Sequence, residues 1–518
     1  MRNRLDLGLL ALATAGSVAA ATPSPSPAEI ARAHVRAHEP EILREFADLL
    51  SLPNVASDTP NIRKNAEHIR RMLEKRGLAV EILDGASGPP ALYGERRTAG
   101  AKRTLVVYAH YDGQPVVESQ WTTPPFSPVL LDAARPAGKP IDLATLAGSA
   151  PKEAYLYARS AGDDKAPIQA LLSALDALTV AHIPLSVNLK VFLEGEEEAG
   201  SPHLRAVLER EKERLAADAW LFCDGPVHQT RRPLIVFGVR GVTDVEATLY
   251  GPARPLHSGH YGNWAPNPAA ELAELVTHLR DDEGHILVSG FYDDVRPPTE
   301  AEKRAIAEAP EVDGLLKREL LLGRTEGHEK GGGAPRLEET LLRPALNVRG
   351  LQSGNVGERA QNAIPSEARL SIDFRLVPDQ TPDKVRERFE AHLAGLGYTV
   401  VHDTPSPEAR LAHPRLVKLV WGAGYPAYRA SLDDPLARAL RASIERATGG
   451  PVVVLPTGGG SLPLYIFAEV LRVPIVILPI ANHDDNQHAV DENLRVQNLR
   501  EGVAMYAEVL AGLGADWK

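Results

Sequence analysis

The chain has 518 residues, of which 44% are hydrophobic and 24% are charged, values that are ordinary for a globular protein of two or more domains. Its net charge is −11 and no basic stripe interleaved with aromatic residues is present, so the composition argues against nucleic acid as a partner. The sole cysteine, Cys223, excludes an intramolecular disulfide.

The N-terminal segment is typical of a cleaved secretory signal. Arg2 and Arg4 precede an apolar stretch at residues 7–18, and small residues follow at 19–21. The apolar stretch is short for a membrane span. We therefore expect residues 1–21 to be a signal peptide, and the mature chain to be soluble, secreted or periplasmic in a bacterium, and free of the membrane. A disordered N-terminal tail is the alternative.

Residues 22–240 alternate between predicted helices and strands. Ser26, Pro27 and Glu29 provide an N-cap, a first-turn proline and a capping acid, and they predict a helix that ends near Leu52. The alternation that follows predicts a three-layer α/β domain. Its further predicted elements are strands at 79–83, 104–109, 184–193 and 219–223, and helices at 165–181 and 202–215.

From about Gly241 the pattern changes to long alternating strands, each followed by a helix. This order predicts a small two-layer α+β domain, residues 241–405, inserted into the first domain. Residues 406–518 return to the α/β pattern and close with a helix from about Asn493. The other predicted elements are strands at 242–251, 367–377, 452–455 and 473–479, and helices at 267–281 and 382–396.

The segment "FLEGEEEAGS", residues 192–201, places four acids directly after a predicted buried strand. Crowded carboxylates repel one another unless a positive charge lies among them. Taken alone, the segment reads more simply as a solvated acidic turn. Histidines and acids also follow other predicted strands, however, and an α/β sheet presents its ligands at strand ends. These polar residues are His110, Asp112, Asp163, Asp164, Lys165, Glu197, Glu198, Asp224, His483 and His488.

The residue types in this set point to a metal site. Histidine and carboxylate ligands without a thiolate suit zinc, manganese or cobalt in a catalytic site. The carboxylates are too many for one ion, whereas two divalent ions that share a bridging carboxylate would offset the negative charge. We therefore predict two divalent metal ions per subunit, with zinc as the first choice.

Motifs along nearly the whole chain after the leader are similar to those of one known family. They are "HYDGQP", "YARSAGDDKAP", "FLEGEEEAGS", "FCDG", "GVRG", "PLHSGHYG", "NAIPSEARLSIDFRLVP", "GGGSLP" and "DNQHAVDEN", in the family's order and spacing. On these motifs the sequence resembles the dinuclear zinc metallopeptidases that include carnosinases, aminoacylases, carboxypeptidase G and bacterial dipeptidases. It is most similar to the carnosinase-like dipeptidase branch. The resemblance implies a catalytic larger domain and an inserted lid domain.

The resemblance also implies a role for each polar residue of the predicted site. Asp112 would orient the imidazole of His110. Glu197 would be the general base, which takes a proton from the attacking metal-bound water, leaving hydroxide, and passes it to the leaving amine. The implied ligands are His110 and Asp224 for one metal ion, Glu198 and His488 for the other, and Asp163 as the bridge.

Substrate capture is implied for residues in other motifs. Arg375 would bind the terminal carboxylate of the substrate through its forked guanidinium. Gly460 and Ser461 would offer a backbone N–H and a hydroxyl to the same group. His257 and Asn362, both in the inserted domain, would reach the substrate carbonyl. From local sequence alone, these segments read as a strand-surface arginine, a glycine turn and an ordinary loop.

Two positions depart from the family's pattern. Ser160 and Ala166 stand beside "AGDD" where relatives usually have glycine, and either residue could shift the loop that carries Asp163. The peptide bond between Asp163 and Asp164 is typically cis in relatives, a form that is rare outside proline. None of the implied ligands and bases is missing from the sequence.

We therefore expect a secreted dinuclear metallopeptidase, of the dipeptidase or carboxypeptidase type, that hydrolyses dipeptides or short peptides with a free C-terminal carboxylate. An N-acyl-amino-acid amidohydrolase is the nearest alternative, because the same site cleaves both bonds. A binding protein without chemistry is a further alternative, against which the intact Glu197 argues. The resemblance also implies a homodimer formed through the lid, with His257 acting in the neighbouring site. A monomer whose lid serves its own site is the alternative.

Overall fold

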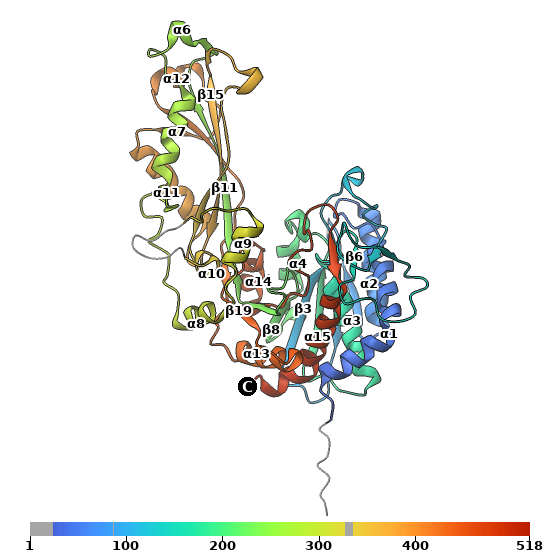
Figure 1. Ribbon diagram of the computed structural model, residues 1–518. Helices are drawn as coiled ribbons and strands as arrows, with labels where there is room; N and C mark the ends of the chain where they lie inside the picture. Colours follow the sequence, from blue (N-terminus) through green and yellow to red (C-terminus); the bar gives the residue numbers. More distant parts are fainter. Residues whose placement is uncertain (1–23, 86–87, 327–334) are drawn as a thin grey trace, which may run out of the picture.

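The computed structural model describes residues 24–85, 88–326 and 335–518, which form two units (Figure 1). The larger unit is a layered α/β structure, and the smaller unit projects from it as a long sheet with helices on one face. The predicted signal peptide lies outside the described residues. Among the helices that the structure describes, none is both long and apolar enough to cross a membrane.

The larger unit is built on an eight-stranded sheet. Its central strands β7, β3, β8 and β20 run parallel, so their carboxyl ends lie along the same edge of the sheet. Across the sheet, the strands are β1 (Ala79–Leu83), β2 (Ala91–Arg96), β7 (Asn188–Glu194), β3 (Thr104–His110), β8 (Ala219–Phe222), β20 (Ile475–Ile477), β9 (Leu234–Val236) and β19 (Val453–Leu455).

The two faces of this sheet carry separate hydrophobic cores, because side chains alternate along each strand. In β3, Leu105 and Val107 belong to one core, and Val106 and Tyr108 belong to the other. Helices cover both faces, which confirms the predicted three-layer α/β domain. The first core includes α1 (Pro27–Leu50), α2 (Thr59–Glu74), α3 (Lys165–Val180), α13 (Pro435–Thr448) and α15 (Val496–Asp516), and the second includes α4 (Leu204–Arg210), α5 (Lys212–Leu215) and α14 (Leu464–Leu471).

The predicted ends of two helices can be compared with the structure. Helix α1 begins as predicted, because Ser26 and Glu29 form a reciprocal capping box around its first turn. The closing helix begins at Val496 and not near Asn493, because residues 493–495 pair with β6 as a strand. This pairing belongs to a small antiparallel sheet of β21 (Asn493–Arg495), β6 (Tyr155–Tyr157), β4 (Val129–Leu131) and β5 (Pro140–Ile141).

The smaller unit contains a five-stranded sheet that α7 and α11 cover on one face. Its longest strands, β11 and β15, pair antiparallel over ten residues, from Gly241 opposite Leu376 to Tyr250 opposite Glu367. Two layers of this kind confirm the predicted α+β insertion. Its elements are β13 (Ala345–Gln352), β15 (Glu367–Leu376), β11 (Gly241–Tyr250), β17 (Leu416–Trp421), β16 (Thr399–Val401), α7 (Pro268–Leu279), α11 (Pro382–Gly395) and α12 (Pro407–Ala412).

The smaller unit extends beyond the predicted boundary at residue 405. Strand β17 pairs antiparallel with β11 and parallel with β16, so it completes the sheet of the inserted unit. The chain returns to the larger unit only after Trp421. At the junction, β10 (Gly238–Val239) pairs with β18 (Tyr428–Arg429), so the outgoing and returning segments lie side by side.

A segment of three short helices within the insertion lies against the larger unit (Figure 1). Glu302 of this segment pairs with Arg429 at 3.2 Å, and both side chains are buried. Helix α8 packs on strand β19 of the larger sheet. The helices are α8 (Glu300–Glu308), α9 (Asp313–Glu319) and α10 (Leu337–Thr340).

Candidate active site

Three neighbouring parallel strands deliver polar residues to one edge of the larger sheet. His110 ends β3, and Asp224 follows β8 after one intervening residue. Glu197 and Glu198 begin a short 3₁₀ turn that follows β7. Because β7, β3 and β8 are adjacent, their carboxyl ends bring these side chains together, as the sequence pattern predicts.

Asp163 reaches this edge by a different route. It follows β6, which belongs to the small antiparallel sheet, and it precedes α3. Its Oδ1 lies 2.8 Å from Nε2 of His110, and its Oδ2 lies 3.1 Å from Nε2 of His488. His488 in turn lies 3.2 Å from Oε2 of Glu198. One carboxylate therefore connects two groups of side chains.

Each group offers three close ligand atoms. His110, Asp163 and Asp224 form the first group, and Asp163, Glu198 and His488 form the second. Within each group the ligand atoms lie within 4.8 Å of one another. We call these five residues the acid–histidine cluster. Two sets of three donors that share one carboxylate have the chemistry of a two-metal site.

Asp112 holds two parts of the cluster in place. Its Oδ1 accepts a hydrogen bond from the backbone N–H of Glu197 at 3.1 Å, and its Oδ2 accepts one from Glu198 at 3.0 Å. Oδ1 also lies 3.4 Å from Nδ1 of His110. The side chain of Asp112 is fully buried, so these contacts fix the imidazole and the acid pair relative to each other.

The electrostatics of the cluster show how much negative charge is concentrated there. Burial and Asp163 raise the pKa of Asp224 to about 7. Burial raises the pKa of Glu197 well above its usual value, and nearby carboxylates add to this effect. Burial alone would also raise the pKa of Asp163, but His110 and His488 hold it far below its usual range.

The electrostatics of the histidines also indicate that the cluster accommodates positive charge. Hydrogen bonds to Asp163 and Glu198 raise the pKa of His488 to about 10. The residues therefore fit divalent cations, because a bound cation would supply the charge that protons on histidine otherwise supply.

Glu492 organises the loop that carries Asp163, although no role is predicted for it from the sequence. Its carboxylate is buried and accepts hydrogen bonds from the backbone N–H groups of Ser160, Gly162 and Asp163 at 2.9 to 3.1 Å. Arg159 donates to the same carboxylate at 2.7 Å. The motif "DNQHAVDEN" contains Glu492 four residues after His488, so its proximity to a candidate ligand was the available signal.

The departure from glycine at residue 160 has a visible geometric context. Ser160 has a φ of 63°, in the left-handed region that favours glycine. Its hydroxyl accepts a hydrogen bond from Nδ2 of Asn54 at 2.9 Å, so the side chain is accommodated in a buried polar position. The peptide bond between Asp163 and Asp164 is cis.

Not every polar residue that follows a predicted strand joins the cluster. The ammonium of Lys165 is buried against α1 and α2, where it donates to Leu49 O and Asn65 Oδ1. Burial lowers the pKa of Lys165 to about 7. Asp164 accepts from the backbone N–H of His110 and so braces β3. His483 belongs to neither group of candidate ligands.

The residues predicted to capture a carboxylate lie at the base of the smaller unit. Nη1 of Arg375 donates to Oγ of Ser461 at 2.9 Å, and its Nε donates to Asp373 at 3.0 Å. Asp373 is buried and also accepts from Asn347 at 3.2 Å. The hydrogen bond from Nε of Arg375 to Asp373 fixes one edge of the guanidinium. The structure thus brings Arg375 and Ser461 together, and Gly460 precedes Ser461 in the chain.

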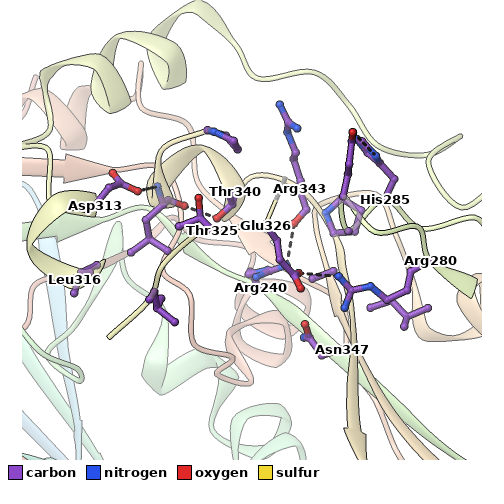
Figure 2. Close-up of a pocket in the computed structure, with 18 of the residues that line it drawn as sticks. Arg240, Arg280, His285, Asp313, Leu316, Thr325, Glu326, Thr340, Arg343 and Asn347 are labelled. Carbon is purple, nitrogen blue, oxygen red and sulfur yellow. Dashed lines mark hydrogen bonds and ion pairs between the residues drawn. The ribbon is translucent and has the colours of Figure 1, made fainter. Parts of the chain in front are cut away.

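A pocket of about 350 Å³ lies beside Arg375 and Ser461, between the base of the sheet and helices α9 and α10 (Figure 2). Arg240 of the motif "GVRG" lines it and donates to the carbonyl of Arg343 at 2.9 Å. Burial, together with the nearby Arg375, lowers the pKa of Arg240 to about 10. Its backbone N–H donates to Gly460 O, so Arg240 links the base of the sheet to the loop that carries Ser461.

His257 and Asn362 lie far from the cluster of their own chain. His257 precedes α6 (Ser258–Tyr261), which stands at the outer end of the smaller unit (Figure 1). The backbone N–H of Ser258 donates to the carbonyl of Asn362, so the two predicted residues are neighbours. Both are exposed. The structure therefore brings them together but does not bring them to the acid–histidine cluster.

Comparison with known proteins agrees with this arrangement. The family model described as Peptidase family M20/M25/M40 matches residues 106–512, which is most of the chain. The chain belongs to peptidase family M20/M25/M40. It is therefore a hydrolase of the peptidase type, and the resemblance found in the sequence is confirmed.

Individual relatives match over most of their length. The Cys-Gly metallodipeptidase dug1 of Schizosaccharomyces pombe is 25% identical over 486 residues, which cover 90% of this chain and 94% of the relative. The human Beta-Ala-His dipeptidase is 27% identical over 441 residues, which cover 82% and 78%.

Solved structures extend the comparison to the fold. The metallo-carboxypeptidase Sso-CP2 of Sulfolobus solfataricus, of the M20 family, is 28% identical with a TM-score of 0.72, over 92% of this chain and 99% of that chain. Human carnosine dipeptidase 1 has a TM-score of 0.71 at 23% identity, over 95% and 100%, and shares the fold. The architecture of a layered α/β unit with an inserted α+β unit is thus that of M20 peptidases.

Proposed function

We propose that the protein hydrolyses dipeptides or short peptides that have a free C-terminal carboxylate. One observation carries this proposal: a single cavity of about 450 Å³ is lined both by Asp163, Asp224 and His488 of the acid–histidine cluster and by Gly460 and Ser461, beside Arg375. A short peptide can place its scissile carbonyl at the cluster and its carboxylate at the arginine. The names of the relatives, which include dipeptidases and a carboxypeptidase, support the same class of substrate.

Two divalent ions, with zinc as the first choice, would be held by His110 and Asp224 and by Glu198 and His488, with Asp163 as the bridge. When bound, they would polarise the scissile carbonyl and acidify the attacking water. Glu197 then takes a proton from that water and delivers it to the leaving amine. Its raised pKa suits a group that must both accept and release a proton.

The arrangement of the chain supports this division of labour between the adjacent acids. Asp112 accepts hydrogen bonds from the backbone N–H groups of both Glu197 and Glu198, so one carboxylate fixes the backbone that carries both side chains. Glu198 faces His488, whereas Glu197 lines the cavity without belonging to either ligand group.

The test is metal analysis combined with a cleavage screen. Purified protein should contain close to two divalent ions and should cleave dipeptides with a free C-terminus in preference to their C-terminal amides. N-acetyl amino acids in the same screen test the amidohydrolase alternative. If they are hydrolysed faster than the peptides, the proposed activity is that of a deacylase and not of a peptidase. Absence of any hydrolysis by metal-loaded protein would contradict both.

We further propose that the protein is a homodimer and that His257 acts in the site of the neighbouring subunit, beside Asn362. The position of both residues at the exposed outer end of the unit supports this, because they cannot serve their own cluster from there. Large apolar side chains are also exposed on this unit, among them Trp264 at 78% and Val356 at 87%. Such exposure is typical of an interaction surface.

Complementation between inactive variants tests this arrangement. His257→Ala and Glu197→Gln proteins should each be inactive alone. After subunit exchange, heterodimers should regain one site that has both an intact base and a donated histidine. Heterodimers confirmed by differential tags that remain inactive would rule out action between subunits, and a monomer in solution would rule out the dimer.

Secretion remains a proposal based on residues 1–21. N-terminal sequencing of the mature protein from the periplasmic fraction of the source bacterium should show loss of about this segment. An intact N-terminus in the cytoplasmic fraction would contradict it.

A further inference from the structure

The cavity has a strongly apolar wall that the proposed chemistry does not use. The wall is formed where three strands of the larger sheet approach the inserted segment, and its members are Leu234, Val236, Leu455, Ile477 and Leu341. The four strand residues are each less than 10% exposed. Among the described residues that line the cavity, the only acidic or basic side chains are Glu197, His228 and three members of the cluster, namely Asp163, Asp224 and His488.

The position of the wall relative to the reacting groups decides which part of a peptide meets it. The scissile carbonyl of a dipeptide must lie at the acid–histidine cluster, and its carboxylate must lie at the Arg375–Ser461 pair. The residue between those two points is the C-terminal residue. Because Asp163, Asp224 and His488 of the cluster, the wall and Ser461 line one continuous cavity, the wall is within reach of the side chain of the C-terminal residue.

The inserted segment closes this part of the cavity. Leu341 follows α10, and its side chain lies next to Gly459. A Cβ added to Gly459 would lie 3.3 Å from Cδ2 of Leu341. The imidazole of His228 lies beside the segment: its Nδ1 accepts a hydrogen bond from the backbone N–H of Thr230, and its Nε2 faces Oε1 of Glu338 at 4.0 Å. Both side chains are buried. The wall is therefore a built surface with contributions from both parts of the chain.

We propose that the preferred substrates are dipeptides whose C-terminal residue is large and apolar, such as leucine, methionine or phenylalanine. This inference rests on the proposed peptidase function and adds the substrate class. Glycine at that position would leave the wall in contact with water or empty space, and a charged side chain would lose its hydration without a partner. The expected preference differs from the C-terminal glycine and histidine named in the relatives Cys-Gly metallodipeptidase and Beta-Ala-His dipeptidase.

The first measurement compares Ala-Leu with Ala-Gly on the metal-loaded native protein. Because even one methylene in an apolar pocket changes kcat/KM by about 10-fold or more, Ala-Leu should exceed Ala-Gly by at least about 10-fold. The second measurement uses Leu341→Trp, which fills the cavity from the inserted segment. It should lower kcat/KM for Ala-Leu by at least about 10-fold and leave Ala-Gly nearly unchanged.

Leu315→Trp is the matched control, because Leu315 lies on the same inserted segment, is 43% exposed and lines neither this cavity nor the pocket beside Arg240. It should change neither substrate. Equal or faster cleavage of Ala-Gly by the native protein overturns the inference and leaves the peptidase function standing, and this comparison needs no variant to fold. An equal loss for both substrates in Leu341→Trp also overturns it. Failure to cleave any peptide overturns the peptidase function itself, and the inference with it.

Discussion

The loop of Asp163 in the larger unit buries charged side chains in contact with one another, whereas the sheet of the inserted unit around Arg349 exposes them to water. Glu492 is 1% exposed and accepts four hydrogen bonds in the loop of Asp163. Arg349 on the inserted sheet also meets two acids, Asp244 and Glu246, but its side chain is 41% exposed. The same types of ion pair therefore fix the conformation of a loop around Glu492, whereas around Arg349 they lie on a solvent-exposed surface.

This difference follows from what each unit has to position. The two metal ions proposed for the larger unit would require ligands held to within a fraction of an ångström, and buried, fully hydrogen-bonded groups give that precision. The inserted unit needs a stiff sheet, which its ten-residue strands and the apolar core beneath α7 and α11 provide. Four substitutions, in order of decreasing expected effect, test the comparison.

Glu197→Gln should lower turnover by about 10²–10⁴-fold while the metal content and the fold are retained, because only proton transfer is removed. Steady-state kinetics and metal analysis on the same sample check this. Glu196→Gln is the matched control, because Glu196 is the neighbouring acid but bonds to His203 outside the cluster. A comparable loss in the control, or near-normal turnover of Glu197→Gln, would refute the assignment of the base.

Glu492→Gln should destabilise the larger unit by about 3–5 kcal/mol, because Arg159 is left buried without its counter-charge. Metal affinity should fall by about 10–100-fold, since the loop of Asp163 loses its support. Urea unfolding and metal titration measure the two effects. Glu469→Gln makes the same change in an exposed pair with Arg205 and should alter neither. Equal effects from both variants would remove the distinction between the two kinds of ion pair.

Arg375→Lys keeps the charge but loses the planar fork, so kcat/KM for peptides with a free C-terminus should fall by about 10–100-fold, the value of one or two hydrogen bonds to a charged group. C-terminally amidated peptides should be cleaved slowly by the native protein and at an unchanged rate by the variant. If free and amidated peptides lose activity in parallel, Arg375 does not bind the carboxylate.

Arg349→Ala should change the stability of the inserted unit by no more than about 1 kcal/mol, because its ion pairs are exposed to solvent. Thermal unfolding at low and high salt checks this. A loss as large as that of Glu492→Gln would show that charge on the inserted sheet is structural after all.

The positions of polar residues after predicted strands indicate which side chains lie close together. The structure brings these side chains together where a strand of the main sheet leads directly to the residue. His110, Glu198 and Asp224 are examples, because apolar runs and the acids after them are both visible locally. Asp163 follows a strand of a separate sheet, so strand order alone does not predict its place between His110 and His488; the family resemblance implies that place, and the structure shows the contacts with both histidines. Glu492 was overlooked because hydrogen bonds to backbone N–H groups leave no pattern in side-chain sequence.

The order of strands and helices predicts the inserted unit, but the predicted boundary at residue 405 comes before the last strand of its sheet. Strand β17 is short and follows a helix, so its sequence is compatible with either unit. Its pairing with β11, in which Leu249 lies opposite Val417, decides the matter. The apolar wall of the cavity was also invisible, because its members come from three strands and an inserted segment that are distant in sequence.

The ten-residue strands of the inserted unit act as a lever. At about 3.4 Å per residue, β11 and β15 extend about 30 Å from the level of Arg375 toward the end that carries His257. A rotation of only about 5° at the base therefore moves the outer end by about 3 Å, given that length. A change of orientation too small to disturb Arg375 is thus large enough to make or break a hydrogen bond at His257.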